Sequence, residues 1–74
     1  MKEVGTFWEL EGNDIYYMII GKFDTHNTCL LYDNFSKTME NATLTEEEGS
    51  HLIPSTKLDI NMLFIEELSR WVIQ

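Results

Sequence analysis

The stretch that decides the fold is residues 15–20, Ile-Tyr-Tyr-Met-Ile-Ile, in which every side chain is branched, aromatic or otherwise apolar. Side chains of these kinds fit a pleated sheet. Strands of antiparallel sheets commonly turn polar residues to water on one face, but this stretch has none to turn. We therefore predict a central strand that is buried on both faces.

The residues before this stretch predict its hairpin partner. Residues 6–11 read Thr-Phe-Trp-Glu-Leu-Glu, an alternation that separates two apolar side chains from two glutamates. Trp8 and Leu10 share one face, and Glu9 and Glu11 share the other. The turn between the two runs, Gly12-Asn13-Asp14, consists of residues that tolerate a positive φ. A β-hairpin over residues 6–20 is therefore expected.

Further strands and a helical turn follow along the chain. After a polar turn at residues 24–27, the run Thr-Cys-Leu-Leu-Tyr at 28–32 is again apolar on both faces and completes a three-stranded meander. A second turn at Asp33-Asn34 leads to a more polar run at 37–42, which fits a fourth strand at the sheet edge. Thr45-Glu46-Glu47-Glu48 has the form of a capping box and predicts a short helical turn.

An amphipathic helix is predicted at the C-terminal end of the sequence. A capping pattern at residues 56–59 precedes apolar residues that recur three and four positions apart. These residues are Leu58, Met62, Ile65, Leu68 and Val72. Leu58, Ile60, Met62 and Phe64 also alternate as a strand would, until Glu66 and Glu67 break that pattern, and we favour the helix.

The predicted architecture is a single α+β domain spanning residues 1–74. It consists of a small antiparallel sheet, a meander of three to four strands, with the C-terminal amphipathic helix covering one face. The other face needs a second cover. Closing the sheet into a partly closed barrel resembling the SH3 type would bury it, and so would pairing two copies of the chain in a homo-oligomer.

The charge of the chain restricts its partners. Thirteen acidic residues against five basic ones give a formal net charge of −8, spread from Glu3 to Glu67. A field of this sign repels nucleic acids and anionic membrane surfaces and attracts basic surfaces. The apolar runs at residues 15–20 and 62–65 are far too short to cross a membrane. With one cysteine and no apolar leader, the chain is expected in the cytoplasm of the cell that contains it.

Catalytic and metal-binding residues are sparse. His26 and Cys29 have a spacing seen in zinc sites, with His51 as a third donor, but structural sites usually have four clear ligands. His26 and Cys29 also face opposite sides of one strand, which disfavours a nucleophilic dyad. A substrate cleft of about 300 Å³ or more is hard to form in 74 residues. We therefore expect no enzyme activity, no metal and no cofactor.

The leading functional hypothesis is an inhibitor that docks on the basic, nucleic-acid-binding surface of a larger protein. The predicted charged contacts are Glu9, Glu11, Asp14, Glu46, Glu47 and Glu48, whose carboxylates would imitate phosphates. Phe7 and Phe35 are the predicted exposed aromatic anchors. Small acidic proteins of this kind look like the accessory proteins with which phages and other mobile elements counter host defence, an argument by analogy.

Other interpretations stay open. The run Glu46-Glu47-Glu48 also fits an ordinary solvated helix start. The chain could instead form an oligomer that captures a small nucleotide-like ligand at subunit interfaces, or could be a structural subunit that buries its uncovered sheet face in a larger assembly.

Overall fold

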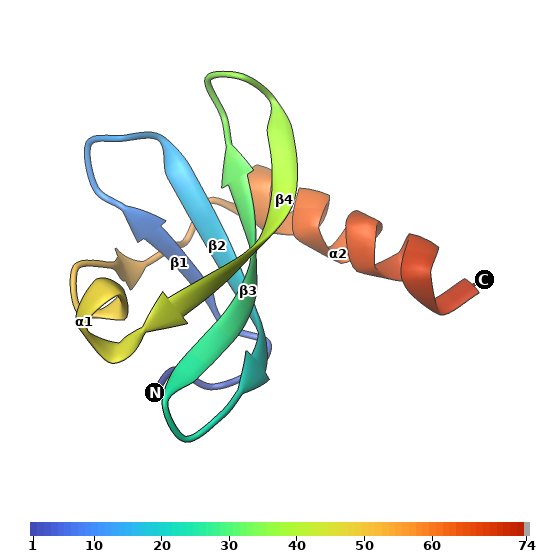
Figure 1. Cartoon of the computed structure of the whole chain (residues 1–74). Coiled ribbons are helices and arrows are strands. Elements are labelled where there is room, and N and C mark those ends of the chain that lie inside the picture. The colour runs from blue at the N-terminus through green and yellow to red at the C-terminus, as the bar shows by residue number, and fades with distance from the viewer. Residues whose placement is uncertain (74) are drawn as a thin grey trace.

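The computed structural model describes the backbone of residues 1–73 and the side chains of residues 1–70. It contains a five-stranded antiparallel sheet with strand order β4-β3-β2-β1-β5, and two helices (Figure 1). The elements in chain order are β1 (Phe7–Leu10), β2 (Ile15–Lys22), β3 (His26–Asp33), β4 (Thr38–Thr45), α1 (Glu46–Gly49), β5 (Ile53–Pro54) and α2 (Leu58–Ile73). The fold is a small α+β domain whose sheet is curled but not closed.

The predicted hairpin and central strand are confirmed. β1 pairs with β2 from Phe7 opposite Met18 to Leu10 opposite Ile15. The turn between them uses Gly12 at φ +83° and Asp14 at φ +55°, which agrees with the residue types found there. β2 lies between β1 and β3, and its middle residues are buried on both faces of the sheet.

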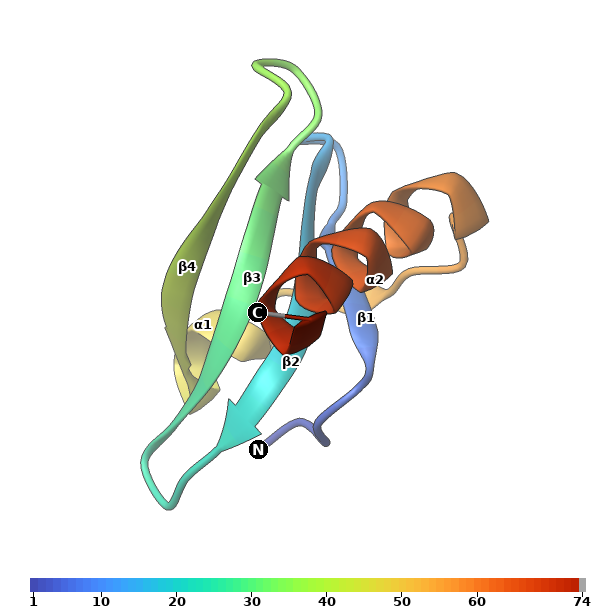
Figure 2. The ribbon, with the colours of Figure 1, turned by 90° about the vertical axis from the view of Figure 1, so that its right-hand side faces the viewer.

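One face of the sheet is covered by α2, as predicted. Figure 2 shows α2 crossing in front of the sheet. The buried residues of this face form one cluster: Tyr16, Met18, Leu30, Tyr32, Ile60 and Phe64. Phe64, which is fully buried, lies at the centre, with its ring centroid 6.2 Å from that of Phe7 and 6.4 Å from that of Tyr32. Helix and sheet are thus held together mainly by aromatic and aliphatic contacts.

The second face is covered by the chain itself. After β4, the chain passes through α1 and returns to pair β5 with β1, with Pro54 opposite Trp8 and Ile53 opposite Glu9. The cluster buried under this return consists of Tyr17, Ile19, Cys29, Leu44 and Leu52. The sheet does not close into a barrel, because β4 and β5 do not pair, and the returning chain covers the second face. The two-residue strand β5 was not predicted, because so short a segment carries no alternation.

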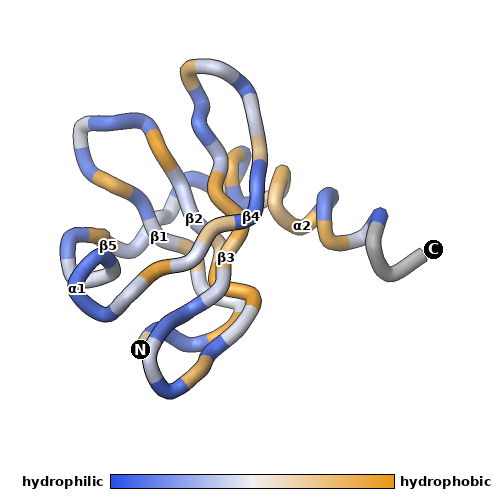
Figure 3. Tube along the Cα trace, viewed as in Figure 1, coloured by the Kyte–Doolittle hydropathy of each residue, from blue (hydrophilic) through white to orange (hydrophobic). Residues whose placement is uncertain are grey.

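The helix prediction is correct, but the predicted buried face of α2 is wrong. Leu58, Met62 and Ile65 are 76%, 50% and 42% exposed, whereas Ile60 and Phe64 are 5% and 0% exposed. Asn61, which lies between these two residues in the sequence, is buried as well. Because Asn61 is polar, the buried face of α2 looks less apolar in the sequence than the exposed face does. Figure 3 shows the resulting mixture of apolar and polar segments along α2. Leu68 packs partly against the cluster, and the side chain of Val72 lies outside the described residues.

The predicted short helix and its capping box are confirmed. The Thr45 hydroxyl accepts the Glu48 backbone N–H (3.2 Å), and the Glu48 carboxylate accepts the Thr45 backbone N–H (2.9 Å). The fourth strand is also confirmed, although it runs further than predicted, to Thr45. Neither helix, as far as the structure describes them, is long and apolar enough to cross a membrane.

The corrected face of α2 can be tested with two matched substitutions. We expect Ile60→Ala to lower the free energy of unfolding by about 2–5 kcal/mol, because it empties a buried site, and Ile65→Ala to lower it by less than about 1 kcal/mol. Both remove the same atoms from the same helix. Urea unfolding followed by far-ultraviolet circular dichroism measures both, and equal losses would contradict the packing described.

Candidate functional site

Three of the predicted contact residues come together at one end of the sheet. They line a hollow of about 290 Å³, which we call the acidic hollow. Its residues are Glu9, Leu10, Glu11, Gly12, Asp14, Tyr16 and Lys57. The first five belong to β1 and its turn, Tyr16 to β2, and Lys57 precedes α2. The hairpin therefore supplies the carboxylates, and the segment leading into α2 brings a cation to them.

Asp14 fixes this end of the molecule. Its carboxylate accepts the Tyr16 hydroxyl proton at 2.6 Å and an Asn34 amide proton at 3.0 Å. The Asn34 backbone N–H also donates to the Asp14 carbonyl oxygen at 3.1 Å. The pKa of the Asp14 carboxyl lies below its usual value. The main cause is the hydrogen bond from Tyr16, and the second is that from Asn34. The β1–β2 turn is thereby joined to the β3–β4 turn.

The acidic hollow already holds a cation. The Lys57 Nζ atom lies 2.6 Å from the Tyr16 hydroxyl oxygen, 3.7 Å from a Glu9 carboxylate oxygen and 4.9 Å from the centroid of the Tyr16 ring. Its hydrogen bond to Tyr16 is the main reason why the pKa of the Lys57 ammonium is raised. The Tyr16 hydroxyl can donate to Asp14 and accept from Lys57 at once. The Glu9 carboxylate, the Tyr16 hydroxyl and the Tyr16 ring together favour a positively charged group in the acidic hollow.

Phe35 is exposed, as predicted, on the turn that Asn34 joins to Asp14 of the acidic hollow. It is 91% exposed on the β3–β4 turn. The turn is fixed by Asp33, whose Oδ1 atom accepts the backbone N–H groups of Phe35 (2.9 Å) and Ser36 (3.4 Å). The Lys37 N–H donates to the Asp33 carbonyl at 2.8 Å, with Lys37 at φ +60°. An aromatic ring is therefore presented to solvent from a backbone that is held in place.

Phe7 is not exposed in the way that the sequence suggested. It shares the sheet face of Glu9, and α2 covers that face, so the Phe7 ring is half-buried against Phe64. The expectation of an exposed anchor is wrong because α2 packs on the face of β1 that carries Glu9. Glu9 is affected as well, with its side chain only 19% exposed.

The three glutamates of α1 lie at the other end of β4, away from the acidic hollow (Figure 1). β4 runs from Thr38, opposite Asp33, to Thr45, opposite His26. The Glu48 carboxylate is engaged in the capping box, and its hydrogen bond with the Thr45 N–H is the main cause of its lowered pKa. Glu46 borders a different cavity, and Glu47 is exposed. The predicted carboxylates thus do not form one surface.

The cysteine considered for metal binding or catalysis is a core residue. Cys29 is fully buried, donates weakly to the Ala42 carbonyl (Sγ to O, 3.5 Å), and has a pKa raised to about 11, chiefly by burial. A nucleophilic thiol needs the opposite shift. Among the described residues, no three histidine, cysteine, aspartate or glutamate side chains converge in a way that could hold a metal ion.

The largest described cavity was not anticipated from sequence. It has a volume of about 450 Å³, a size that we expected to be hard to form in so short a chain. Its walls come from the N-terminal segment, β1, the start of β3 and α1. Segments so far apart leave no local pattern in the sequence, although Trp8 was correctly assigned to the face on which the cavity lies.

The hydrogen bonds of Asp14 predict a specific response to pH. Because its folded pKa is depressed, Asp14 stabilises the fold above the unfolded pKa of about 3.9, and this stability is lost as the pH falls through the lower folded value. We expect Asp14→Asn, which keeps a residue type suited to the positive φ, to show a shallower loss of unfolding free energy between neutral and acidic pH. Asp24→Asn, in the β2–β3 turn, controls for the lost charge and should keep the steeper wild-type loss.

Comparison with known proteins finds no relative of this chain. No family model matches the sequence, and no curated protein or solved structure matches the chain significantly. The interpretation of the acidic hollow and of the cavity therefore rests on their own geometry and chemistry.

Proposed function

We propose that this chain is a non-enzymatic binding protein that docks on an arginine- or lysine-rich surface of a larger protein and blocks that surface. The observation that carries the proposal is the pairing of the acidic hollow with Phe35. The carboxylates of the hollow already hold an ammonium group, and the β3–β4 turn, which Asn34 joins to Asp14, carries an aromatic ring that is 91% exposed. Basic surfaces that bind nucleic acids offer the complementary cations.

The charge balance of the chain supports this proposal. Within the described residues, three of the thirteen carboxylates form ion pairs with a basic side chain. They belong to Glu3, Glu9 and Glu67. The other carboxylates leave a net negative field that accelerates encounter with a cationic partner.

The acidic hollow has acceptors left for an incoming cation. The Glu11 side chain is exposed at its rim. Each Asp14 carboxylate oxygen accepts one hydrogen bond and keeps a second lone pair. A guanidinium group carries five donors in a planar fork and suits such a pair of carboxylates better than a second ammonium does. Arginine is therefore the residue that we place in the hollow.

Phe35 supplies the apolar part of the contact. Interface hot spots are commonly aromatic side chains that lose water on binding, and an arginine side chain can stack on such a ring. Because the Asp33 hydrogen bonds already order the turn, little conformational entropy is lost when a partner covers the ring. Carboxylates that occupy a basic surface in this way exclude phosphates from it, which is how inhibition would arise.

Two double variants with the same net charge test whether the position of the negative charges matters. A fluorescein-labelled nona-arginine peptide serves as the probe, and stopped-flow anisotropy measures its association and dissociation rates. We expect Glu9→Gln/Glu11→Gln to slow association about three- to tenfold at low salt. Glu46→Gln/Glu47→Gln changes the net charge equally at the other end of β4 and should change the rate less than about twofold. Equal effects would mean that net charge alone attracts the peptide.

The contribution of Phe35 has its own matched control. We expect Phe35→Ala to raise the dissociation rate of the same peptide about three- to tenfold, since stacking of a cation on the ring is lost. Phe23→Ala removes the same atoms from a ring that is 53% exposed on the β2–β3 turn and should leave the rate unchanged. A larger effect of Phe23→Ala would move the docking surface to the opposite end of the sheet.

A further inference from the structure

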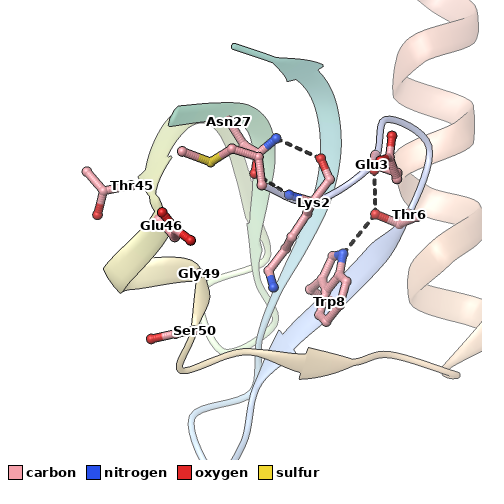
Figure 4. A pocket seen from close by; sticks show the side chains of 10 residues that line it. Lys2, Glu3, Thr6, Trp8, Asn27, Thr45, Glu46, Gly49 and Ser50 are labelled. Carbon is pink, nitrogen blue, oxygen red and sulfur yellow. Dashed lines mark hydrogen bonds between the residues drawn. The ribbon is translucent and has the colours of Figure 1, made fainter. Parts of the chain in front are cut away.

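The largest described cavity lies between the N-terminal segment and α1, on the sheet face opposite α2. Its volume is about 450 Å³, within the range of small-molecule sites. Figure 4 shows Lys2, Trp8 and Asn27 on one side of it and the α1 residues on the other. The lining residues that bear on a ligand are Lys2, Trp8, Thr45, Glu46 and Gly49.

The backbone of Lys2 is held at the cavity by a buried amide. Asn27 is 2% exposed, and its Oδ1 atom accepts the Lys2 N–H at 3.0 Å. Its Nδ2 group donates to the carbonyl oxygens of Lys2 (2.9 Å) and Gly21 (3.0 Å). One side chain therefore binds both backbone groups of Lys2, as a neighbouring strand would, although residues 1–6 form no strand. The position of the Lys2 side chain follows from this anchor.

The Lys2 side chain lies between Trp8 and α1. Its Nζ atom is 3.6 Å from the centroid of the Trp8 ring, and the absence of a side chain at Gly49 makes room for it, since a Cβ atom there would come 3.3 Å from Lys2 Cε. The Trp8 ring is fixed in turn by its Nε1–H, which donates to the Thr6 hydroxyl at 2.8 Å. The cavity thus has an aromatic wall and a cation in defined positions.

Among the side chains that the structure describes, none is a carboxylate counterion of the Lys2 ammonium. Lys22, Lys57 and Arg70 each pair with a carboxylate, but Lys2 pairs with none among the residues that the structure describes. Glu3, its neighbour, is bound to Lys22 at 2.6 Å. Partial burial of the ammonium lowers its pKa, which an anion beside it would reverse. On a chain with a net charge of −8, a partly buried ammonium group without a carboxylate partner at a cavity offers a position for an anion.

We propose that this cavity binds a small planar molecule carrying one anionic group, which pairs with the Lys2 ammonium while its ring packs against Trp8. The Thr45 hydroxyl lines the same space, accepts the Glu48 backbone N–H and can donate its own proton to the anion. Glu46 stands at the rim and disfavours further negative charge, so the ligand carries a single anionic group. The site is separate from the docking surface and does not depend on it.

The test compares ligands that differ only in charge. The probes are 2-naphthoate against neutral 2-naphthamide, for a carboxylate, and adenosine 5′-monophosphate against adenosine, for a phosphate. Titration of ¹⁵N-labelled protein follows the Trp8 indole N–H resonance, distinguished from that of Trp71 by Trp71→Phe. We expect at least one anion to shift the Trp8 resonance and to bind about tenfold more tightly than its neutral analogue. The pair that does so identifies the anionic group.

Three variants separate the site from general electrostatics. Lys2→Gln should remove the preference for the anion, and Glu46→Gln should strengthen binding of the anion. Lys37→Gln removes a lysine that lies on the exposed β3–β4 turn, with its Nζ bonded to Asn34, and should change nothing. Equal binding of charged and neutral probes, no shift at Trp8 with either pair, or loss of binding in Lys37→Gln as large as in Lys2→Gln would each overturn the proposal.

Discussion

The constraint on which the rest of the structure depends is the burial of β2 on both faces. Tyr16 and Met18 point to one side of the sheet, and Tyr17 and Ile19 to the other, and all four are nearly inaccessible to water. Within residues 1–73, one helix, α2, is long enough to cover a sheet face. The second face is therefore closed by curling the sheet, so that α1, Leu52 and β5 lie over it. Apolar burial of this kind is the main favourable term in folding.

Polar side chains hold the segments that the short sheet leaves unpaired. Asn27 binds the backbone of the N-terminal segment, Asp14 joins two turns, Asp33 orders the turn of Phe35, and Thr45 caps α1. Each of these side chains satisfies backbone or side-chain groups that no strand or helix partner meets. A small domain with a limited core gains from such bonds, because they order loops without requiring more buried apolar surface.

The two candidate sites follow from this arrangement and have opposite charge preferences. At one end, the β1–β2 turn gathers carboxylates, and Lys57 is held among them. On the face opposite α2, the return of the chain leaves a cavity in which Lys2 has no carboxylate partner within the described structure. In the proposed function the first site meets a cationic protein surface, and in the further inference the second meets a small anion. Because they lie apart, one can be altered without removing the other.

The sequence by itself determined the secondary structure and the neighbours of the first four strands, since alternation, turn residues and the capping box act over a few positions. It also placed Trp8 and Leu10 on the correct face and Phe35 in an exposed turn. Only the tertiary structure decided which side of α2 is buried, because Asn61 is accommodated on the face that Ile60 and Phe64 turn to the sheet. It likewise decided the burial of Phe7, the pairing of β5 and the cavity at Lys2. These depend on contacts between residues far apart in the chain, and the free energy of such contacts comes from packing, which no local pattern encodes.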